Sequence, residues 1–222
     1  MGIEIKRLGA AVGAEITGID LADDIGDNLF RQVHQAFLDH TVLVFRDQDL
    51  EPDAQVAFSR RFGPSERHVL KQFAQPDNPD VLLISNLKEK GKAKGAIRAG
   101  QYWHSDLSYM GEPSRCSLLY AIDVPVDGGD TEWANMYLAY ETLPKELKTR
   151  IAGLRAIHQF DLVENPRFGP PVDMKPEDLK GSIWEKKSAA VKARTPSVIH
   201  PIARTHPATG RKALFVSRRF TT

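Results

Sequence analysis

The chain has 222 residues, of which 41% are hydrophobic and 27% charged, a composition typical of a globular protein with one substantial core. Thirty basic residues against 29 acidic ones give a net charge of +1, so no overall field favours nucleic acid or an anionic membrane as a partner. We therefore expect a single domain over residues 1–222 and a small-molecule ligand.

Two further features bear on the compartment. Cys116 is the only cysteine and cannot form an internal disulfide; the first residues lack the charged-then-apolar pattern of a secretory signal. No apolar run approaches the roughly 18 residues that are needed to span a bilayer. These features favour a cytoplasmic protein without a membrane-spanning segment.

The N-terminal part alternates predicted strands and helices. Strands are expected over residues 3–8 and 41–45, because both runs are short and rich in apolar or β-branched residues. A helix over residues 28–39, with Asp27 as its N-cap, is expected between them. A second helix is expected over residues 52–62, since a proline is favoured at the first helical position. This part of the chain is predicted to be mixed α and β.

Beyond residue 80, predicted strands outnumber helices. One helical pattern covers residues 134–143 and leads to Pro144, at the start of a helical run that ends at Gly153. Two stretches rich in glycine, proline or charge, residues 88–100 and 165–194, favour solvated loops, and a lid over a pocket is the alternative. Short strands with irregular loops indicate a barrel or sandwich, and the helices are too few for a doubly wound parallel sheet. The strands are expected over residues 81–85, 103–107, 117–124, 154–160, 197–203 and 213–216.

An imidazole and a carboxylate lie two residues apart at His104 and Asp106. Alternate side chains of a strand share a face, so both could reach one metal ion. Two imidazoles and one carboxylate on one face of an octahedron, with the other positions open, are typical of non-haem Fe(II) oxygenases. The pattern therefore predicts two of three iron ligands, although a surface histidine and aspartate on a polar edge is the alternative for an isolated motif of this kind.

A paired glycine turn follows, at Gly128 and Gly129, with Thr131 two residues later. Such a turn lets the backbone fold back tightly and could carry the Thr131 hydroxyl towards the ligand strand, where it could hydrogen-bond a cosubstrate carboxylate. An ordinary hairpin turn is the alternative, because this is common turn chemistry.

Several spaced motifs together resemble the taurine dioxygenase and 2,4-dichlorophenoxyacetate dioxygenase family (TauD/TfdA) of Fe(II)/2-oxoglutarate enzymes. They run in family order from residue 13 to the C-terminal Phe220-Thr221-Thr222. Taken together, such blocks are far more specific than one tripeptide. The matching blocks are residues 13–21, 45–48, 58–63, Trp103-His104-Ser105-Asp106, Gly128-Gly129-Asp130-Thr131 and residues 200–207.

The resemblance implies a fold and a set of site residues. The fold is mainly β with flanking helices, a double-stranded β-helix (jelly roll) that is incomplete at the C-terminus. His104 and Asp106 are implied as metal ligands, and Thr131 as a contact of the 2-oxoglutarate carboxylate. His68 falls where the family places a substrate-binding histidine, and Leu107 where a backbone group approaches the substrate. Phe160 matches an aromatic wall of the pocket.

This sequence also departs from its relatives. Similar proteins continue through further strands that carry a third ligand, a distal histidine, and the arginines that pair with 2-oxoglutarate and the substrate anion; residues 1–222 do not include them. His200 and His206 are the late histidines, but both precede the expected ligand position, and we expect structural roles for them. Lys71 and Gly100 replace residues that taurine enzymes share, which argues against taurine as the substrate.

We therefore expect an enzyme, a 2-oxoglutarate-dependent non-haem iron dioxygenase. It would use Fe(II), with 2-oxoglutarate and O₂ as cosubstrates, to hydroxylate a small organic acid of the alkylsulfonate or aryloxyalkanoate type. By the same resemblance it would be a homo-oligomer. The alternative is a catalytically incompetent, truncated relative that acts as a binding protein. A metal-dependent isomerase or decarboxylase without 2-oxoglutarate is a second alternative, against which the glycine turn before Thr131 argues.

Overall fold

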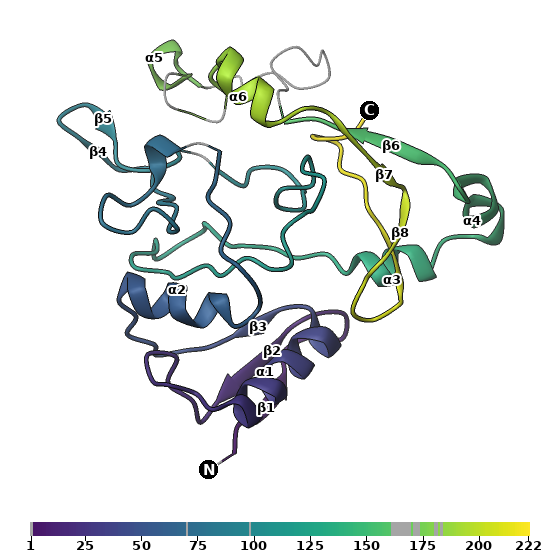
Figure 1. The fold of residues 1–222 in the computed structure, drawn as a ribbon, viewed down its shortest axis with the longest axis horizontal. Coiled ribbons are helices and arrows are strands. Elements are labelled where there is room, and N and C mark those ends of the chain that lie inside the picture. Colours follow the sequence, from purple (N-terminus) through teal and green to yellow (C-terminus); the bar gives the residue numbers. More distant parts are fainter. Residues whose placement is uncertain are drawn as a thin grey trace. The chain divides into compact units, whose positions relative to one another are not determined.

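The structure is a computed structural model that describes residues 2–69, 71–97, 99–160, 170, 174–179, 182 and 184–222. Among these residues, nine strands outnumber six α-helices, and the strands form one three-stranded sheet and three two-stranded sheets (Figure 1). The coarse prediction of many short strands with a few helices is thus confirmed. The chain separates into two compact units, each assembled from three segments.

The first unit comprises residues 1–64, 115–152 and 203–214. Its sheet has the order β1-β2-β3, with β1 (Glu4–Arg7) antiparallel to β2 (Ala14–Thr17) and β3 (Leu43–Val44) parallel to β2. The predicted strands over residues 3–8 and 41–45 are confirmed, within a few residues at each end.

Two predicted helices of the first unit are confirmed as α1 (Asp27–His40) and α2 (Pro52–Arg60). The predicted N-cap is wrong by one residue, because Gly26 occupies that position and Asp27 begins the helix. The Asp27 carboxylate instead accepts a hydrogen bond from Arg61 Nη2 at 2.8 Å. One face of each helix contributes to a core of Leu21, Ile25, Val33 and Phe58. The unit also contains α3 (Met136–Glu141), α4 (Lys145–Ile151), β8 (Ala203–Thr205) and β9 (Lys212–Leu214).

The second unit comprises residues 65–114, 153–202 and 215–222. Its central pair is β6 (Arg155–His158) antiparallel to β7 (Val198–Pro201). Strands are predicted over residues 154–160 and 197–203, and the structure adds that they pair with each other. The last residues lengthen this sheet, since Ile157 and Thr222 exchange two backbone hydrogen bonds. The remaining elements are η1 (Lys71–Phe73), β4 (Lys88–Glu89), β5 (Lys92–Ala93), α5 (Pro176–Leu179) and α6 (Ala189–Arg194).

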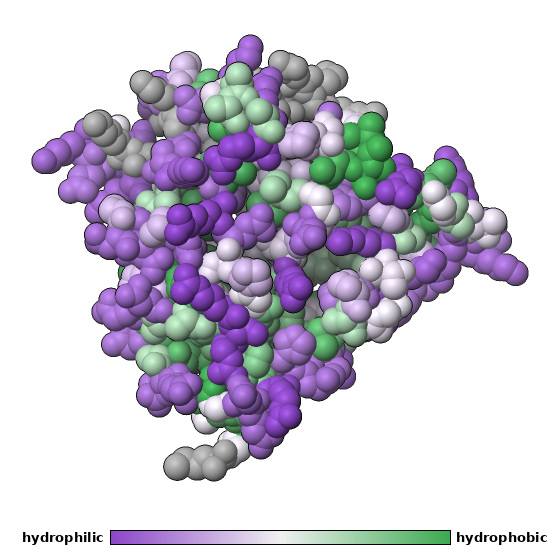
Figure 2. Space-filling view, in the orientation of Figure 1, coloured by the Kyte–Doolittle hydropathy of each residue, from purple (hydrophilic) through white to green (hydrophobic). Residues whose placement is uncertain are grey.

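The loop predictions are partly tested. Residues 88–93 form the β4–β5 hairpin rather than a loop. Part of the second predicted loop, including residues 165–169 and 171–173, lies outside the described residues. The loop prediction is wrong at residues 176–179 and 189–194, which form the helices α5 and α6. The surface of the molecule is mostly polar on the face shown in Figure 2, where hydrophilic side chains predominate and hydrophobic ones form separate patches. No helix of the described chain is long and apolar enough to cross a bilayer.

Three predicted strands are absent or reduced. Residues 103–107 and 117–124 form no strand, and residues 81–85 form only two isolated bridges, at Leu82 and Ile84. A strand needs a partner backbone, but residues 117–124 are tied to their neighbours by individual contacts. The Tyr120 hydroxyl accepts from the Leu50 N–H at 3.2 Å, and the Leu118 carbonyl accepts from the Gln55 amide at 3.3 Å.

Candidate metal and substrate site

His104 and Asp106 lie on a turn rather than on the predicted strand. Residues 101–105 are irregular, and a turn covers residues 106–109. Leu107 has a φ of 50°, in the left-handed region, and the Leu107 carbonyl accepts from the Met110 N–H at 2.9 Å. A residue at positive φ cannot continue an extended strand, which is why the strand prediction is wrong here.

The two side chains nevertheless converge within the turn. His104 Nε2 lies 3.2 Å from Asp106 Oδ1. The His104 Nδ1–H donates to the Tyr102 carbonyl at 2.6 Å, because a carbonyl can only accept. In a neutral imidazole this bond fixes the tautomer and leaves the Nε2 lone pair directed at the carboxylate.

This arrangement fits a divalent metal ion. Two protein ligands at about 2.1 Å in adjacent octahedral positions lie about 3.0 Å apart, close to the 3.2 Å between the His104 and Asp106 donor atoms. A backbone carbonyl on the far ring nitrogen is the usual outer partner of a metal-bound histidine. Within the described residues, no group of three histidine, cysteine or acidic side chains gathers around one point, so the pair accounts for two ligands.

Without a metal, the Asp106 carboxylate favours the protonated form of His104. The hydrogen bond that the Asp106 carboxylate accepts from the imidazole raises the pKa of His104 above its ordinary value, against opposing effects of burial and of the Arg219 charge. The imidazole side chain is 30% exposed and the carboxylate 53%, so both groups can exchange protons with solvent.

His68 is part of the same electrostatic cluster. Burial lowers the pKa of His68, while the Asp106 carboxylate opposes the shift and the Lys187 ammonium adds to it. The His68 ring lies 6.4 Å from the ring of Phe160, in an edge-on arrangement. The structure thus brings three of the predicted site residues, His68, His104 and Asp106, into one neighbourhood, and Leu107 follows Asp106 in sequence.

Buried aromatic rings form the base of this neighbourhood. Tyr109 is 3% exposed, and its ring lies 4.4 Å from Phe160 and 5.3 Å from Phe220. Burial, with the charges of Asp106 and Glu66, raises the pKa of the Tyr109 hydroxyl well above its usual range. Leu107 packs against the same cluster. Phe160, predicted as an aromatic wall, is therefore buried among rings beside His68.

Thr131 belongs to the first unit and is exposed. The predicted glycine turn before it is confirmed in its backbone, since Gly128 and Gly129 have φ values of 74° and 75°. A Cβ on Gly129 would lie 2.9 Å from Pro125 Cγ. Glycine is therefore required there both for its positive φ and for its lack of a side chain. The contact of Thr131 with a cosubstrate stays a prediction.

The late histidines differ in their surroundings. His200 is buried in the second unit, and its Nε2–H donates to the Met110 carbonyl at 2.9 Å, as expected of a structural histidine. His206 lies in the first unit, where it lines a hollow of about 220 Å³; burial, helped by Arg204, lowers its pKa. Lys71 is exposed, as an ordinary solvated lysine would be.

Sequence reasoning missed the cations and rings beyond the motif. Lys187, 8% exposed, lies with Nζ 5.4 Å from the Phe160 ring, and Arg219, 6% exposed, lies against Trp184. Neither sits in a recognisable motif, and both reach the site only through chain folding. A buried cation cannot be told from a surface one by spacing alone.

Comparison with known proteins identifies the family to which the chain belongs. Residues 4–222 match the family described as "Taurine catabolism dioxygenase TauD, TfdA family". The chain is 35% identical to an alpha-ketoglutarate-dependent 2,4-dichlorophenoxyacetate dioxygenase of Cupriavidus pinatubonensis, covering 97% of this chain and 74% of that protein. It is 33% identical to an alkylsulfatase of Acinetobacter baylyi, covering 98% of this chain and 64% of the relative.

A solved structure agrees with these relatives. A putative alpha-ketoglutarate-dependent taurine dioxygenase from Burkholderia xenovorans matches with a TM-score of 0.75 at 29% identity, over 100% of this chain and 67% of the other. The resemblance predicted from the spaced motifs is therefore confirmed. The chain belongs to the TauD/TfdA family of 2-oxoglutarate-dependent dioxygenases, which are non-haem iron oxidoreductases.

Proposed function

We propose that this protein is an Fe(II)- and 2-oxoglutarate-dependent dioxygenase with a jelly-roll core that hydroxylates a small organic acid. The observation that carries the proposal is the convergence of His104 Nε2 and Asp106 Oδ1 at 3.2 Å, with the other ring nitrogen bound to a carbonyl. The names of two relatives, a 2,4-dichlorophenoxyacetate dioxygenase and an alkylsulfatase, support an aryloxyalkanoate or an alkyl compound with a sulfur oxyanion as the substrate.

Each site residue has a role in this proposal. His104 and Asp106 hold the metal, which together with 2-oxoglutarate and O₂ supplies the oxidising chemistry when bound. Thr131 donates its hydroxyl hydrogen to a 2-oxoglutarate carboxylate. His68, kept neutral by burial, donates a hydrogen bond to the substrate acid, and the backbone at Leu107 borders the substrate. The rings of Tyr109 and Phe160 exclude water from its apolar part.

Anaerobic addition of Fe(II) and then 2-oxoglutarate tests the proposal. The wild-type protein should develop a visible charge-transfer absorption when 2-oxoglutarate chelates the bound iron. His104→Ala should abolish it, whereas His34→Ala, which alters a histidine in α1 of the other unit, should leave it unchanged. Absorption that survives His104→Ala would show that the ligand assignment is wrong.

A binding protein without catalysis is the second candidate, because no third ligand lies near the pair within the described part of the chain. Succinate formation with aryloxyacetates and alkylsulfonates separates the two functions. The dioxygenase produces succinate in proportion to substrate oxidised. A binding protein takes up the same acids, measured by calorimetry, and forms no succinate.

A further inference from the structure

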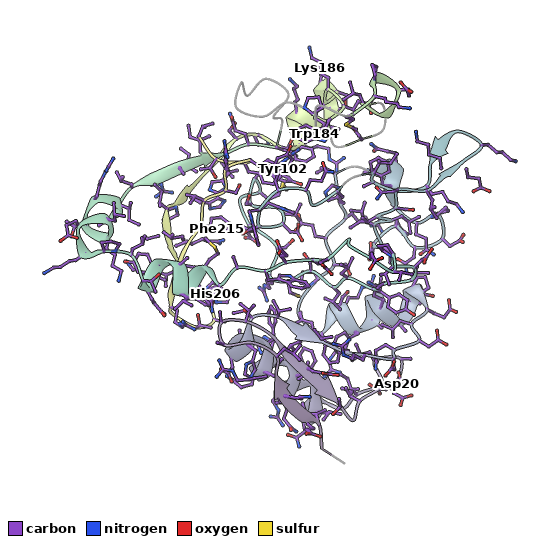
Figure 3. All side chains as sticks on the ribbon, turned by 180° about the vertical axis from the view of Figure 1, so that it is seen from behind. Asp20, Tyr102, Trp184, Lys186, His206 and Phe215 are labelled. Atoms are coloured by element: carbon purple, nitrogen blue, oxygen red, sulfur yellow. The ribbon has the colours of Figure 1, made fainter. Side chains whose placement is uncertain are left out.

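The Arg219 side chain is enclosed by aromatic rings in the second unit. Its Cζ atom lies 4.2 Å from the ring of Trp184, 5.3 Å from Tyr102 and 5.5 Å from Phe220. Figure 3 labels Tyr102 and Trp184, whose ring centroids lie 5.5 Å apart. The guanidinium is thus held on several sides by π-faces, a favourable setting for a cation.

The backbone that carries Arg219 is fixed by hydrogen bonds. The Phe220 N–H donates to Ser217 Oγ at 3.0 Å, and the Ser217 N–H donates to Thr221 Oγ1 at 2.9 Å. The Gln159 N–H also donates to the Phe220 carbonyl at 2.9 Å, which joins this turn to the strand beside it. The guanidinium therefore projects from a rigid base.

Among the residues that the structure describes, no acid forms an ion pair with Arg219. The residue is 6% exposed, and within the described part of the chain the buried Nη1 has no hydrogen-bond partner. Burial lowers the pKa of Arg219 to about 10, and the groups that oppose this shift are the hydroxyls of Tyr102 and Tyr109 rather than carboxylates. A buried guanidinium without an oxyanion is costly, because it has lost water and gained no equivalent partner.

This cation adjoins the proposed metal ligands. The Phe220 ring that contacts Arg219 lies 6.0 Å from the His104 ring, and Tyr102 both covers the guanidinium and binds His104 through its carbonyl. Tyr102 is half-buried, whereas Trp184 and Phe220 are buried. Among the three rings, Tyr102 is thus the least enclosed.

We propose that Arg219 is a substrate-binding residue whose guanidinium pairs with the carboxylate or sulfonate of an organic acid entering beside His104 and Asp106. The planar fork of arginine matches such oxyanions with two parallel hydrogen bonds, and the surrounding rings suit an apolar or aryl body on the same molecule. The inference rests on the proposed function, because it takes the ligand to be a substrate or cosubstrate of that site.

Calorimetric titration of the metal-free protein, in the presence of a chelator, tests this role without requiring turnover. The probes are phenoxyacetate, hexanesulfonate and 2-oxoglutarate. Arg219→Gln should weaken binding of at least one probe about tenfold or more, as expected for loss of a charge-assisted hydrogen bond. Arg218→Gln removes the same charge from an exposed neighbour and should change the Kd less than twofold.

Arg219→Lys tests the same role if the glutamine variant does not fold. It retains the cation but loses the bidentate fork, so the same probe should bind several-fold more weakly while the melting temperature stays near that of the wild type. The probe that depends on Arg219 identifies the ligand as the primary substrate or as 2-oxoglutarate. An unchanged Kd in folded Arg219→Gln or Arg219→Lys, or an equal loss in Arg218→Gln, overturns the proposal.

The charge-transfer absorption and the calorimetric titration together separate this inference from the proposed function. If the charge-transfer absorption fails in the wild type but the probes still bind through Arg219, the iron chemistry is wrong and the anion site stands. If the absorption appears but no probe depends on Arg219, the iron site stands and the anion site is wrong.

Discussion

At the scale of single residues, the imidazole of His104 is the most constrained group of the site. One ring nitrogen donates to the Tyr102 carbonyl, and the other lies 3.2 Å from the Asp106 carboxylate. Two lone pairs at that distance repel unless a cation lies between them, and the choice is a proton or a metal ion. Proton and metal therefore compete for the same position.

This competition predicts a pH dependence that Asp106 controls. The Asp106 hydrogen bond raises the pKa of His104 above the ordinary 6.5, so in the metal-free protein the pair stabilises the fold below pH 6.5. That contribution is lost as the pH rises through the raised pKa. The affinity for the metal should instead increase as the pH rises through the same range, because the imidazole loses its proton there.

Nuclear magnetic resonance of the His104 ring protons in the metal-free protein measures the effect. Asp106→Asn should lower the pKa of His104, because the carboxylate is the largest cause of the shift. Asp123→Asn, a change at an exposed aspartate, should leave it unaltered. An identical titration in wild type and Asp106→Asn would contradict this account.

At the scale of elements, the stability of the short helix α3 depends on the hydrogen bonds at its N-terminal end. α3 has six residues and begins after Asn135, whose Oδ1 accepts from the Leu138 N–H at 3.0 Å. The Asn135 Nδ2 also donates to the Ala11 carbonyl at 2.7 Å, which ties the helix start to the loop between β1 and β2. By contrast, α1 and α2 begin without a side-chain cap and rely on their length and buried faces.

Asn135→Ala should therefore lower the free energy of unfolding by about 1 to 2 kcal/mol, through loss of a helix cap and a second hydrogen bond. Urea denaturation measures this change. Asn135→Ser restores a capping hydroxyl but is too short for the Ala11 contact, so it should recover part of the loss. Equal stability of the alanine variant and the wild type would show that the cap contributes nothing.

At the scale of the whole molecule, two separate hydrophobic cores are formed by residues distant in sequence. One gathers around Val33 and Phe58, and the other around Tyr109, Phe160 and Phe220. The second core includes the rings on which the candidate site rests. Burial, rather than residue type, decides which hydrophobic side chains stabilise the fold.

Replacing a buried valine and an exposed valine by alanine tests this statement. Val33 is 0% exposed and Val126 is 101% exposed. Val33→Ala should lower the free energy of unfolding by about 2 kcal/mol, from lost burial and a residual cavity. Val126→Ala should change it by less than about 0.5 kcal/mol. Similar losses at both positions in chemical denaturation would mean that Val126 is covered in solution.

The sequence by itself determined the family, the helices of the N-terminal part and the presence of strands where β6 and β7 lie. These follow from motif order and from local periodicity, which act over a few residues and are readable in the chain. It also singled out His104 and Asp106, although the reason offered, alternation along a strand, was wrong.

Only the tertiary structure decided how that site is built. The convergence of His104 and Asp106 depends on a turn with Leu107 at positive φ, and whether residues 103–107 and 117–124 pair as strands depends on partners far along the chain. The burial of Arg219 among Trp184, Tyr102 and Phe220 likewise joins distant segments. Such contacts are set by packing between segments, and local sequence preferences do not specify them.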